Sequence, residues 1–461
     1  MDNFDIVIMG AGPGGYVAAI RAAQLGKSVA IVEANHLGGI CLNWGCIPTK
    51  ALLRSAEVFD LIKHSESFGI TVNNPKFDIK KIVERSRAIA KQLSGGVAHL
   101  MKKNKIEVIN GFGKLEGMQG GKHIISIDKR KITATNVIVA TGARARTLPN
   151  IQPDGKDIWT YREAMVPEKM PKSLVVVGSG AIGIEFASFY CSMGADVTVV
   201  EIMDRILPVE DEEISKFAQK VFEKRGIKFM TGASVEKVEK GLKVTVKPKS
   251  GPQVVIECEK VISAVGIMGN IEDIGLDKTK IKTEKSHILT DKFCQTDEPG
   301  IYAIGDVTGA PWLAHKASHE GIIAVEHMTG QKHVHALDKN NIPGCTYSSP
   351  QIASVGMTEK QAKDAGYKIK VGRFSALGNG KAIAMGETDG LVKTIFDEKT
   401  GELLGAHMVG AEVTELIQGF GIAKTCEATE AELVNNIFAH PTLSEMMHES
   451  VLDAYGRVIH M

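Results

Sequence analysis

Residues 4–15 read Phe-Asp-Ile-Val-Ile-Met-Gly-Ala-Gly-Pro-Gly-Gly, an apolar run that ends in a cluster of glycines. This order predicts a strand over 4–9, a tight turn, and a helix that continues through Gln24. In such a unit the glycines allow the turn, let the backbone approach a pyrophosphate, and let the helix pack on the strand. A second strand over 28–32 ends at Glu33, where a carboxylate can accept hydrogen bonds from a ribose. The dinucleotide site predicted here consists of Gly10, Gly12, Gly14, Gly15 and Glu33.

The same pattern occurs a second time. A strand over 174–177 leads into a glycine turn, a helix through Met193, and a strand over 196–200 that ends at Glu201. The first glycine and the acid are 23 residues apart in both copies. One glycine cluster alone is weak evidence, but strand, helix and acid recur together here. The second predicted nucleotide site consists of Gly178, Gly180, Ala181, Ile182, Gly183 and Glu201. A carboxylate at 201 repels a 2′-phosphate, which favours NAD over NADP, although Arg205 lies close by.

Composition limits the classes of function. A chain of 461 residues suggests about three domains at roughly 150 residues each. The 55 basic and 54 acidic residues give a net charge of +1, so no electrostatic footprint for nucleic acid or an anionic membrane is expected. The N-terminus lacks a signal-peptide pattern, and no apolar run approaches the ~18 residues of a membrane helix. A cytoplasmic location is expected, and a mature mitochondrial matrix protein would have the same features.

The pattern of elements changes along the chain. Residues 147–173 carry four of the fifteen prolines and predict a connector, while 78–103 predict a long amphipathic helix before it. After residue 346 we expect an antiparallel α+β arrangement. Its strands are predicted over 351–356 and 367–374 and in a hairpin over 391–409, followed by helices over 412–424 and 430–438. The predicted fold class is α/β, with two Rossmann-like domains and a C-terminal α+β domain.

Residues 41–46 read Cys-Leu-Asn-Trp-Gly-Cys and hold the only close pair among seven cysteines. The other five are scattered and are interpreted as buried structural thiols: Cys191, Cys258, Cys294, Cys345 and Cys426. An isolated pair in a chain of cytosolic character is more often catalytic or metal-binding than structural. No second Cys/His pair at ligand spacing exists, and His333 and His335 are expected at the surface, so no metal site is predicted. Two reduced buried thiols remain the alternative to a redox-active disulfide.

The spacing of the pair constrains its backbone. Residues five apart in a regular helix are separated by about 7.5 Å, whereas a disulfide needs Cα atoms roughly 4.4–6.8 Å apart. If Cys41 and Cys46 are bonded, their segment cannot be regular helix. We expect Gly45 to absorb the distortion and Pro48 to start a helix after it.

Two nucleotide sites and one disulfide suggest an electron relay. Nicotinamide transfers hydride and thiols exchange by thiolate attack, so a flavin is needed to link them. We therefore expect FAD at the fingerprint nearest the cysteines and NAD at the distal one. Thiol chemistry also needs a base, and residues 440–445, His-Pro-Thr-Leu-Ser-Glu, offer an imidazole beside a carboxylate. By itself, a histidine near the C-terminus is more often structural.

With these residues identified, the chain resembles the pyridine nucleotide–disulfide oxidoreductases over its full length, and among them the dihydrolipoamide dehydrogenases. Residues 39–50 are similar to the family's redox signature, residues 140–142 and 304–306 to two further FAD motifs, and residues 440–445 to its base motif. Trp44 departs from the valine that is common in the family. The resemblance implies an FAD domain over 1–145, an NAD domain over 146–270, a central segment over 271–340 that completes the FAD domain, and a dimerisation domain over 341–461.

The resemblance also implies the roles of further residues. Cys41 would receive the attack of a dihydrolipoyl thiol, Cys46 would pass electrons to the flavin, and His440 with Glu445 would act as the base in the active site of the second subunit. Lys50 and Glu185 match an ion pair near the flavin. Further FAD contacts would be Gly39, Lys50, Gly113, Thr141, Gly142, Gly305, Asp306 and Ala314. Further NAD contacts would be Val235, Ala264 and Gly266.

The implied protein is a homodimer with one non-covalent FAD per subunit that reduces NAD⁺ to NADH. Its partner would be a lipoyl-bearing acyltransferase (E2) or the H-protein of glycine cleavage, with neither nucleic acid nor a membrane involved. Alternatives within the family are glutathione and mercuric reductases. Glu201 counts against the first, and the absence of a C-terminal cysteine pair after Cys426 counts against the second. A non-catalytic flavin scaffold would be expected to have lost the cysteines or His440.

Overall fold

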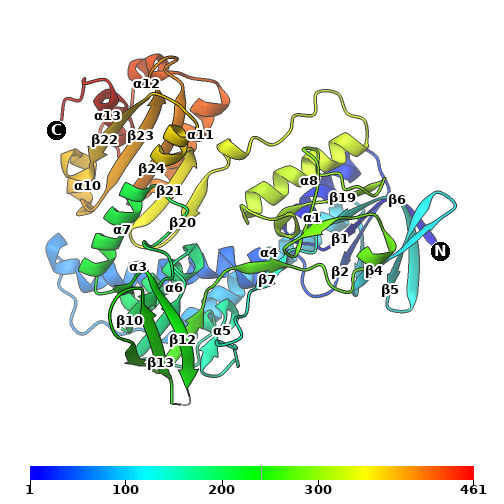
Figure 1. Cartoon of the computed structure of the whole chain (residues 1–461), viewed down its shortest axis with the longest axis horizontal. Coiled ribbons are helices and arrows are strands. Elements are labelled where there is room, and N and C mark those ends of the chain that lie inside the picture. Colours follow the sequence, from blue (N-terminus) through cyan, green and yellow to red (C-terminus); the bar gives the residue numbers. More distant parts are fainter. Residues whose placement is uncertain (240, 461) are drawn as a thin grey trace. The chain divides into compact units, whose positions relative to one another are not determined.

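The computed structural model describes residues 1–239 and 241–460, and the chain divides into two compact units (Figure 1). Unit 1 contains residues 1–51, 81–146 and 266–337. Unit 2 contains residues 52–80, 147–265 and 338–461. Each unit is therefore built from segments that lie far apart in the sequence. Among the described residues, no helix is both long and apolar enough to cross a membrane.

A seven-stranded sheet forms the centre of unit 1. Its order is β3-β2-β1-β6-β5-β4, and β19 pairs with the end of β6. The pairs β3–β2, β2–β1, β1–β6 and β6–β19 are parallel, whereas β6–β5 and β5–β4 are antiparallel. The strands are β1 (Asp2–Met9), β2 (Val29–Glu33), β3 (Glu107–Asn110), β4 (Gly113–Gln119), β5 (Lys122–Ile127), β6 (Arg130–Val139) and β19 (Ile301–Ala303).

Side chains alternate between the two faces of the sheet along β1, and helices cover one of these faces. Ile6 and Ile8 pack in a cluster with alanines of α1 (Pro13–Gln24) and α8 (Ala314–Met328), which lie side by side (Figure 1). Val7 and Met9 belong to the cluster on the opposite face. The remaining elements of unit 1 are α2 (Gly39–Trp44), β7 (Ala143–Ala145), β16 (Ile267–Gly269), η2 (Leu276–Lys278), β17 (Thr283–Glu284), β18 (His287–Ile288) and η3 (Gly305–Thr308). Both α3 (Cys46–Lys63) and α4 (Ile79–Lys103) begin in one unit and end in the other.

Unit 2 contains a parallel sheet in the order β11-β10-β9-β15-β8 and a three-stranded antiparallel sheet, β12-β13-β14. The elements of this part are η1 (Ser65–Phe68), β8 (Ile158–Trp159), α5 (Tyr161–Ala164), β9 (Ser173–Val177), α6 (Ala181–Ser192), β10 (Asp196–Val200), α7 (Glu212–Lys224), β11 (Lys228–Met230), β12 (Ala233–Glu239), β13 (Lys243–Pro248), β14 (Val254–Glu257) and β15 (Lys260–Ser263). The repeat of the β1–α1–β2 unit as β9–α6–β10 is thus confirmed at the level of backbone structure.

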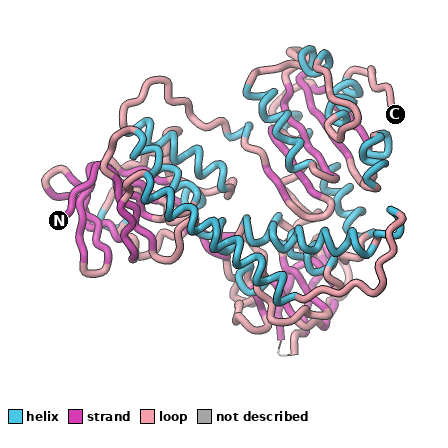
Figure 2. The backbone as a smooth tube through the Cα atoms, turned by 180° about the vertical axis from the view of Figure 1, so that it is seen from behind, coloured by secondary structure: helices cyan, strands magenta, loops and turns pink. Residues whose placement is uncertain are grey.

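The C-terminal part of unit 2 is an antiparallel sheet, β20-β21-β24-β23-β22, with helices beside it (Figure 2). Phe374, Val392 and Met408 face a cluster that includes residues of α11 and α13. The elements are η4 (Lys339–Asn341), β20 (Gly344–Thr346), β21 (Gln351–Gly356), α9 (Glu359–Asp364), β22 (Ile369–Ser375), η5 (Ala376–Gly378), α10 (Gly380–Met385), β23 (Leu391–Asp397), β24 (Leu403–Gly410), α11 (Val413–Thr425), α12 (Glu430–Asn435) and α13 (Glu445–Ala454).

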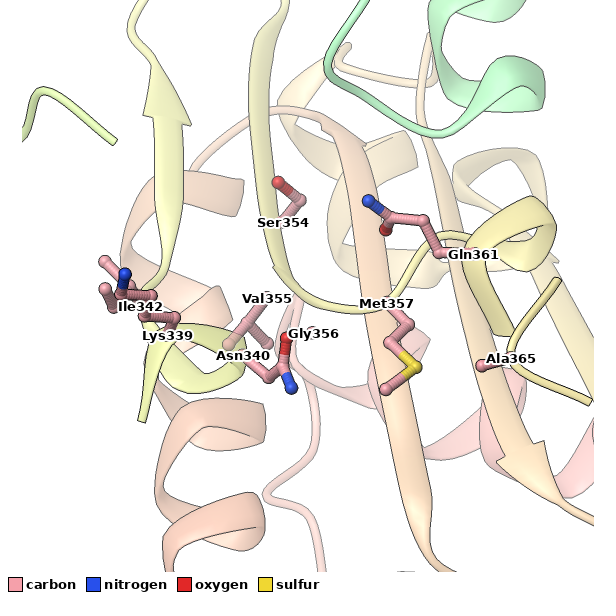
Figure 3. Close-up of a pocket in the computed structure, with 9 residues that line it drawn as sticks. All are labelled: Lys339, Asn340, Ile342, Ser354, Val355, Gly356, Met357, Gln361 and Ala365. Atoms are coloured by element: carbon pink, nitrogen blue, oxygen red, sulfur yellow. The ribbon is translucent and has the colours of Figure 1, made fainter. Parts of the chain in front are cut away.

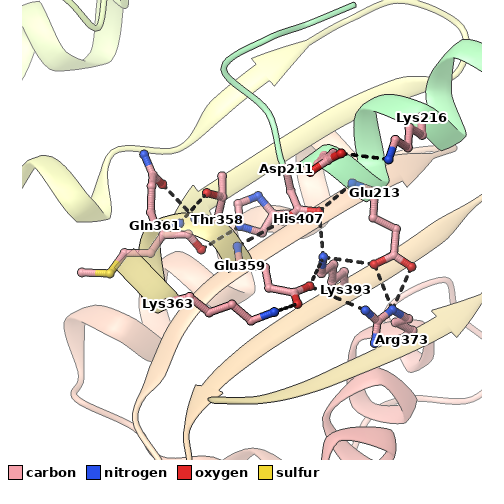
Figure 4. A network of polar contacts seen from close by, with 12 residues as sticks. Asp211, Glu213, Lys216, Thr358, Glu359, Gln361, Lys363, Arg373, Lys393 and His407 are labelled. Carbon is pink, nitrogen blue, oxygen red and sulfur yellow. Dashed lines mark hydrogen bonds and ion pairs between the residues drawn. The ribbon is translucent and has the colours of Figure 1, made fainter. Parts of the chain in front are cut away.

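A buried lysine joins this sheet to α7. Lys393 on β23 has a side chain that is 2% exposed, and its Nζ contacts Asp211 at 2.8 Å, Glu213 at 3.0 Å and Glu359 at 2.7 Å (Figure 4). Asp211 is the N-cap of α7 and also accepts the Glu359 N–H at 3.1 Å. Burial raises the pKa of the Asp211 carboxyl, but its bonds to Lys393 outweigh that effect and the pKa lies below its ordinary value. The lysine thus neutralises acids from two different elements.

The sequence-based predictions of elements are largely confirmed, with three corrections. The helix predicted over 430–438 ends at Asn435, and α13 was not predicted. Pro48 does not start α3, which begins at Cys46, so the proline occupies the third position, where a missing N–H is tolerated. Of the five cysteines interpreted as buried thiols, only Cys294 is fully buried, whereas Cys426 is exposed and the other three are partly exposed.

Candidate functional site

The first glycine turn is packed so tightly that side chains are excluded. Gly10 has φ +109°, and a Cβ there would lie 2.2 Å from the carbonyl oxygen of Ala140. A Cβ on Gly15 would lie 1.9 Å from the carbonyl oxygen of Gly10. At Gly12, by contrast, no atom lies within 4 Å of a Cβ position, so the backbone of the turn is open at the place where a phosphate would approach. The sequence assigned these roles to the same glycines.

The acid that ends β2 is bonded to this turn. Glu33 accepts the Ala11 N–H through Oε2 at 2.7 Å and the Asn35 N–H through Oε1 at 2.8 Å. Each carboxylate oxygen has further lone pairs, so these bonds orient the group and leave acceptor capacity for a ribose hydroxyl. The carboxylate therefore stabilises the turn and keeps acceptor positions that a ligand could use.

The second turn reproduces this geometry in unit 2. Gly178 has φ +99° with the Ala264 carbonyl oxygen 2.4 Å from a Cβ position, and Gly180 again has open space. Glu201 is buried and accepts the Ser179 N–H and hydroxyl, both at 2.7 Å, and the Met203 N–H at 2.8 Å. The equivalence of Glu33 and Glu201 now rests on matching hydrogen bonds as well as on spacing.

Cys41 and Cys46 form a disulfide in unit 1, with Cα atoms 4.7 Å apart. Cys41 lies in α2 and Cys46 begins α3, and the two helices are interrupted at Gly45 (φ −148°, ψ −114°). This interruption confirms that the segment is not one regular helix. Asn43 fastens α2 by donating to the carbonyl oxygens of Leu37 and Gly39, both at 2.9 Å.

The disulfide segment is seated on the first glycine turn. The Gly38 N–H donates to the Ala11 carbonyl oxygen at 2.8 Å. Gly39 has φ +59°, and a Cβ on it would lie 2.7 Å from the Cα of Gly12. Only glycine allows this approach, which brings the start of α2 against the predicted dinucleotide turn. The geometry fits a disulfide that exchanges electrons with a cofactor bound at that turn.

The two further predicted FAD motifs also lie in unit 1 and have partners that the sequence did not indicate. Thr141 Oγ1 donates to the Asn270 carbonyl oxygen at 2.7 Å, and the Asn270 N–H donates to the Gly142 carbonyl oxygen at 2.9 Å. Gly305 has φ +77°, and its N–H donates to Glu320 at 2.7 Å. Neither Asn270 nor Glu320 belongs to a recognisable sequence motif. The spacing of Lys316 and Glu320, four residues apart on α8, could have indicated an ion pair on that helix.

A buried ion pair supports the loop that carries Asp306. Lys316 and Glu320, both on α8, lie 2.9 Å apart, and Lys316 also donates to Thr308 Oγ1 at 3.2 Å. Burial raises the pKa of the Asp306 carboxyl, while the nearby Lys316 acts in the opposite direction. The pair therefore holds η3, which carries Asp306, against α8, the helix that begins at Ala314.

The remaining predicted residues divide between the units. Lys50 lies on α3 in unit 1, and Gly113 begins β4 beside Val32 and Met9. In unit 2, Ala181 and Ile182 open α6, Val235 lies on β12, and Ala264 packs over Gly178. Gly266 has φ +104° and is the first residue of the segment assigned to unit 1. Glu185 in unit 2 accepts the Tyr347 N–H at 3.0 Å, and its pairing with Lys50 stays a prediction.

The predicted base motif forms a hydrogen-bonded pair at the start of α13. His440 Nδ1 lies 3.0 Å from Glu445 Oε1, and the Thr442 N–H donates to Oε2 at 2.8 Å. Burial raises the pKa of Glu445, but the bonds from Thr442 and His440 outweigh it, so the pKa lies below its ordinary value. The His440 side chain is 77% exposed, so its ring is accessible. An oriented, accessible imidazole is what a general base requires.

The cavities found in unit 2 do not contain the predicted residues. One of about 370 Å³ is lined by residues of η4, β21 and α9, among them Lys339, Ser354 and Gln361 (Figure 3). Another of about 580 Å³ lies between α3, α6 and the loop after α10. Over residues 1–239 and 241–460, no group of three or more His, Cys, Asp or Glu side chains is arranged to hold a metal ion.

Comparison with known families decides the assignment. The model of the pyridine nucleotide-disulphide oxidoreductases matches residues 4–321, and that of their dimerisation domain matches residues 342–451. The chain belongs to the pyridine nucleotide-disulphide oxidoreductase family. As a member of that family, it is a flavoprotein oxidoreductase with a C-terminal dimerisation domain, as the sequence predicted.

Curated members of the family are similar over the whole chain. A protein named dihydrolipoyl dehydrogenase from Rhizobium etli is 56% identical, with 99% of both chains covered. Proteins of the same name from Zymomonas mobilis and Bacillus subtilis are 54% and 46% identical, covering 100% and 99% of this chain and 99% of each relative.

Two solved structures have the same fold as this chain. The crystal structure of LpdA from Mycobacterium tuberculosis has a TM-score of 0.90 at 28% identity, covering 98% of this chain and 99% of that one. The HOCl-induced flavoprotein disulfide reductase RclA from Escherichia coli has a TM-score of 0.85 at 25% identity, covering 97% and 99%. The prediction of an α/β fold with an α+β dimerisation domain is confirmed.

The cofactors of this family, FAD and NAD, fit the residues present. The open space over Gly12 and Gly180 is where a phosphate must approach the backbone, and each glycine precedes the free N–H groups of a helix N-terminus. The disulfide is seated on the first of these two turns. That arrangement supports FAD at Gly12 and NAD at Gly180.

Proposed function

We propose that this oxidoreductase oxidises dihydrolipoyl groups with NAD⁺ by using the Cys41–Cys46 disulfide as its first electron acceptor. The observation that carries the proposal is the disulfide itself, held between two helices and packed through Gly39 on the dinucleotide turn at Gly12. The names of the curated relatives support the dihydrolipoyl substrate.

The proposed reaction begins with thiol–disulfide exchange. A substrate thiolate attacks Cys41, the bond between the two cysteines breaks, and Cys46 leaves as a thiolate. The second substrate thiol then attacks the substrate sulfur that is bonded to Cys41, which releases the oxidised cyclic disulfide and the Cys41 thiolate. His440 takes up the proton of an attacking thiol through Nε2, and Glu445 orients the ring through Nδ1.

The chain's residues would hold the cofactors on both sides of this chemistry. FAD, bound by the residues of unit 1 that the sequence assigned to it, supplies the two-electron chemistry that connects a dithiol with NAD⁺. Gly178, Gly180 and Glu201 would bind NAD⁺ in unit 2. Because Glu201 is a buried carboxylate that accepts three hydrogen bonds, a 2′-phosphate would meet a fixed negative charge there.

Dimerisation completes the proposed active site. The dimerisation domain is expected to pair two copies of the chain, so that His440 of one subunit serves the disulfide of the other. The division into domains at residues 145, 270 and 340 belongs to the same proposal, as does the Lys50–Glu185 ion pair. The partner that carries lipoyl would be an E2 acyltransferase or an H-protein. A cytoplasmic location also stays a prediction from the sequence.

An anaerobic titration of the purified flavoprotein with dihydrolipoamide tests the proposal. We expect a long-wavelength absorption band from a thiolate beside the flavin, followed by NADH formation when NAD⁺ is added. The Cys46→Ser variant serves as the control and should give neither signal. If dihydrolipoamide has no effect while NADH still produces the band, the fold and disulfide stand and the lipoyl substrate is wrong. Oxidised glutathione and mercuric ion are then the substrates to test.

A further inference from the structure

Arg87 places a cation on Trp44, one of the four residues between Cys41 and Cys46. Trp44 is the last residue of α2, and the Arg87 guanidinium on α4 lies over its indole ring, with Cζ 4.4 Å from the ring centroid. Both side chains are in unit 1 and partly buried. Arginine keeps its proton in proteins, so the contact brings a permanent positive charge to the disulfide segment.

The charge of Arg87 is poorly compensated by hydrogen bonds. Its Nε and Nη2 atoms are buried, and neither has a hydrogen-bond partner among the described residues. Burial lowers the pKa of the guanidinium, as expected for a cation removed from water. The face of the indole offsets part of this unfavourable burial. A cation in this state favours any negative charge that forms close to it.

The position of Arg87 is fixed because its helix, α4, is hydrogen-bonded to the chain both before Cys41 and after Cys46. Ser94 Oγ donates to the Leu37 carbonyl oxygen at 2.8 Å, before α2. Arg85 donates to the Ala51 carbonyl oxygen at 2.9 Å, after Cys46. Because α4 is attached to the chain at both points, the guanidinium is held against Trp44 by the backbone and not by a mobile loop.

Reduction changes the charge of the segment that Arg87 contacts. When a dithiol reduces the disulfide, the dithiol loses two electrons and two protons and becomes a disulfide. The two electrons break the Cys41–Cys46 bond and leave one thiol and one thiolate, while one of the two protons goes to the base or to solvent. The segment therefore changes from neutral to a charge of minus one. A fixed cation stabilises the second state and not the first.

We propose that Arg87 is a positioning residue for the disulfide. Through its contact with Trp44, the Arg87 guanidinium holds a positive charge at the segment of Cys41 and Cys46 and so stabilises the reduced form of this pair. The Trp44–Arg87 contact makes the disulfide a better electron acceptor. The inference depends on the proposed function only for the identity of the substrate dithiol, because the effect applies to reduction by any dithiol.

The test measures the reduction equilibrium of the cysteine pair directly. The FAD-loaded protein is equilibrated anaerobically at constant pH in mixtures of reduced and oxidised dithiothreitol. Free thiols are then alkylated, and the peptide that carries Cys41 and Cys46 is quantified by mass. We expect Arg87→Gln to shift the equilibrium about tenfold toward the disulfide, which corresponds to about 30 mV for a two-electron couple. Arg87→Lys keeps the charge, and because an ammonium also binds the face of an indole, this variant should stay within about threefold of the parent.

Matched variants separate charge from packing. Lys91→Gln removes an exposed positive charge from the same helix but leaves both attachments of α4 and the contact with Trp44, and it should not shift the equilibrium. If Arg87→Gln does not hold FAD, Trp44→Leu carries the test, because loss of the ring frees the guanidinium and should shift the equilibrium in the same direction. The proposal is wrong if neither variant shifts it, or if Arg87→Lys shifts it as far as Arg87→Gln. A parent protein that does not oxidise dihydrolipoamide refutes the lipoyl substrate and leaves this measurement readable.

Discussion

Replacement of Lys393 by methionine removes the cation that neutralises three acids while nearly preserving the volume of the side chain. The three acids differ in whether another cation remains beside them after the replacement. Glu213 keeps Arg373 at 2.8 Å, and Glu359 keeps Lys363 at 2.6 Å. Asp211, whose side chain is 3% exposed, loses its only cation within salt-bridge distance among the described residues (Figure 4). The variant therefore leaves one buried carboxylate without a counter-charge.

The expected loss of stability follows from that single carboxylate. Removing one partner of a buried ion pair costs about 3–5 kcal/mol. Asp211 still accepts the N–H groups of Glu213 and Glu359, so we expect the lower end, about 3 kcal/mol. For a unit of this size, that corresponds to a decrease of about 5 °C in melting temperature. The difference should shrink as the pH falls toward ~4, because protonation removes the unpaired charge of Asp211 in the variant.

Calorimetry at a fixed protein and FAD concentration measures this loss, since both dimerisation and cofactor binding affect the melting temperature. The matched control is Lys216→Met on α7, which breaks an exposed pair with Glu212 and should change stability by at most about 0.5 kcal/mol. The reasoning is wrong if the Lys393→Met variant melts within 2 °C of the parent, or if both variants are destabilised equally.

Other expected outcomes concern acids and the proposed base. Burial raises the pKa of Glu210 to about 7, so its ionisation destabilises the fold as the pH rises from ~4.5 to ~7. The Glu210→Gln variant should therefore be more stable than the parent at pH 8, by at most about 3 kcal/mol, and equal to it at pH ~4. Melting curves recorded at several pH values would measure this difference. Glu201→Ala should raise the KM for NAD⁺ by roughly tenfold through loss of the ribose contact, with the KM for dihydrolipoamide unchanged in steady-state assays. His440→Gln should lower kcat for dihydrolipoamide oxidation by about 10²–10⁴-fold and spare NADH-dependent dye reduction, in which no substrate thiol is deprotonated.

The parts of the fold that follow local rules were predictable from the sequence. Glycine turns, alternating strands and amphipathic helices leave a signal within a few residues, so both βαβ units and the interruption at Gly45 were correct. The helix α13 was missed because its buried face mixes apolar residues with Glu449 and Ser450, which leaves no clear helical period of apolar residues. The exposure of Cys426 was missed because cysteine is usually buried, and only the packing at the end of α11 decides otherwise.

The supporting contacts of the site could not be predicted. Asn270 bonds to the Thr141–Gly142 turn from a position 129 residues away, and Arg87 reaches Trp44 from a different helix. Such contacts depend on how distant segments meet, which periodicity does not report. The buried Lys393 is a stronger example, because an isolated lysine in an apolar strand gives no indication of which acids neutralise it.

The discontinuous sequence of unit 1 has a consequence for synthesis. Its sheet needs β19 at residues 301–303, and α1 is covered by α8, which ends at Met328. At about 5–20 residues per second, a ribosome needs roughly 10–40 s to proceed from the end of β6 to the end of α8. During this interval the end of β6 that pairs with β19 and the side of α1 that packs on α8 have no partner. The nascent chain therefore becomes competent to capture FAD only late in translation, and a chaperone that shields these surfaces would protect it until then.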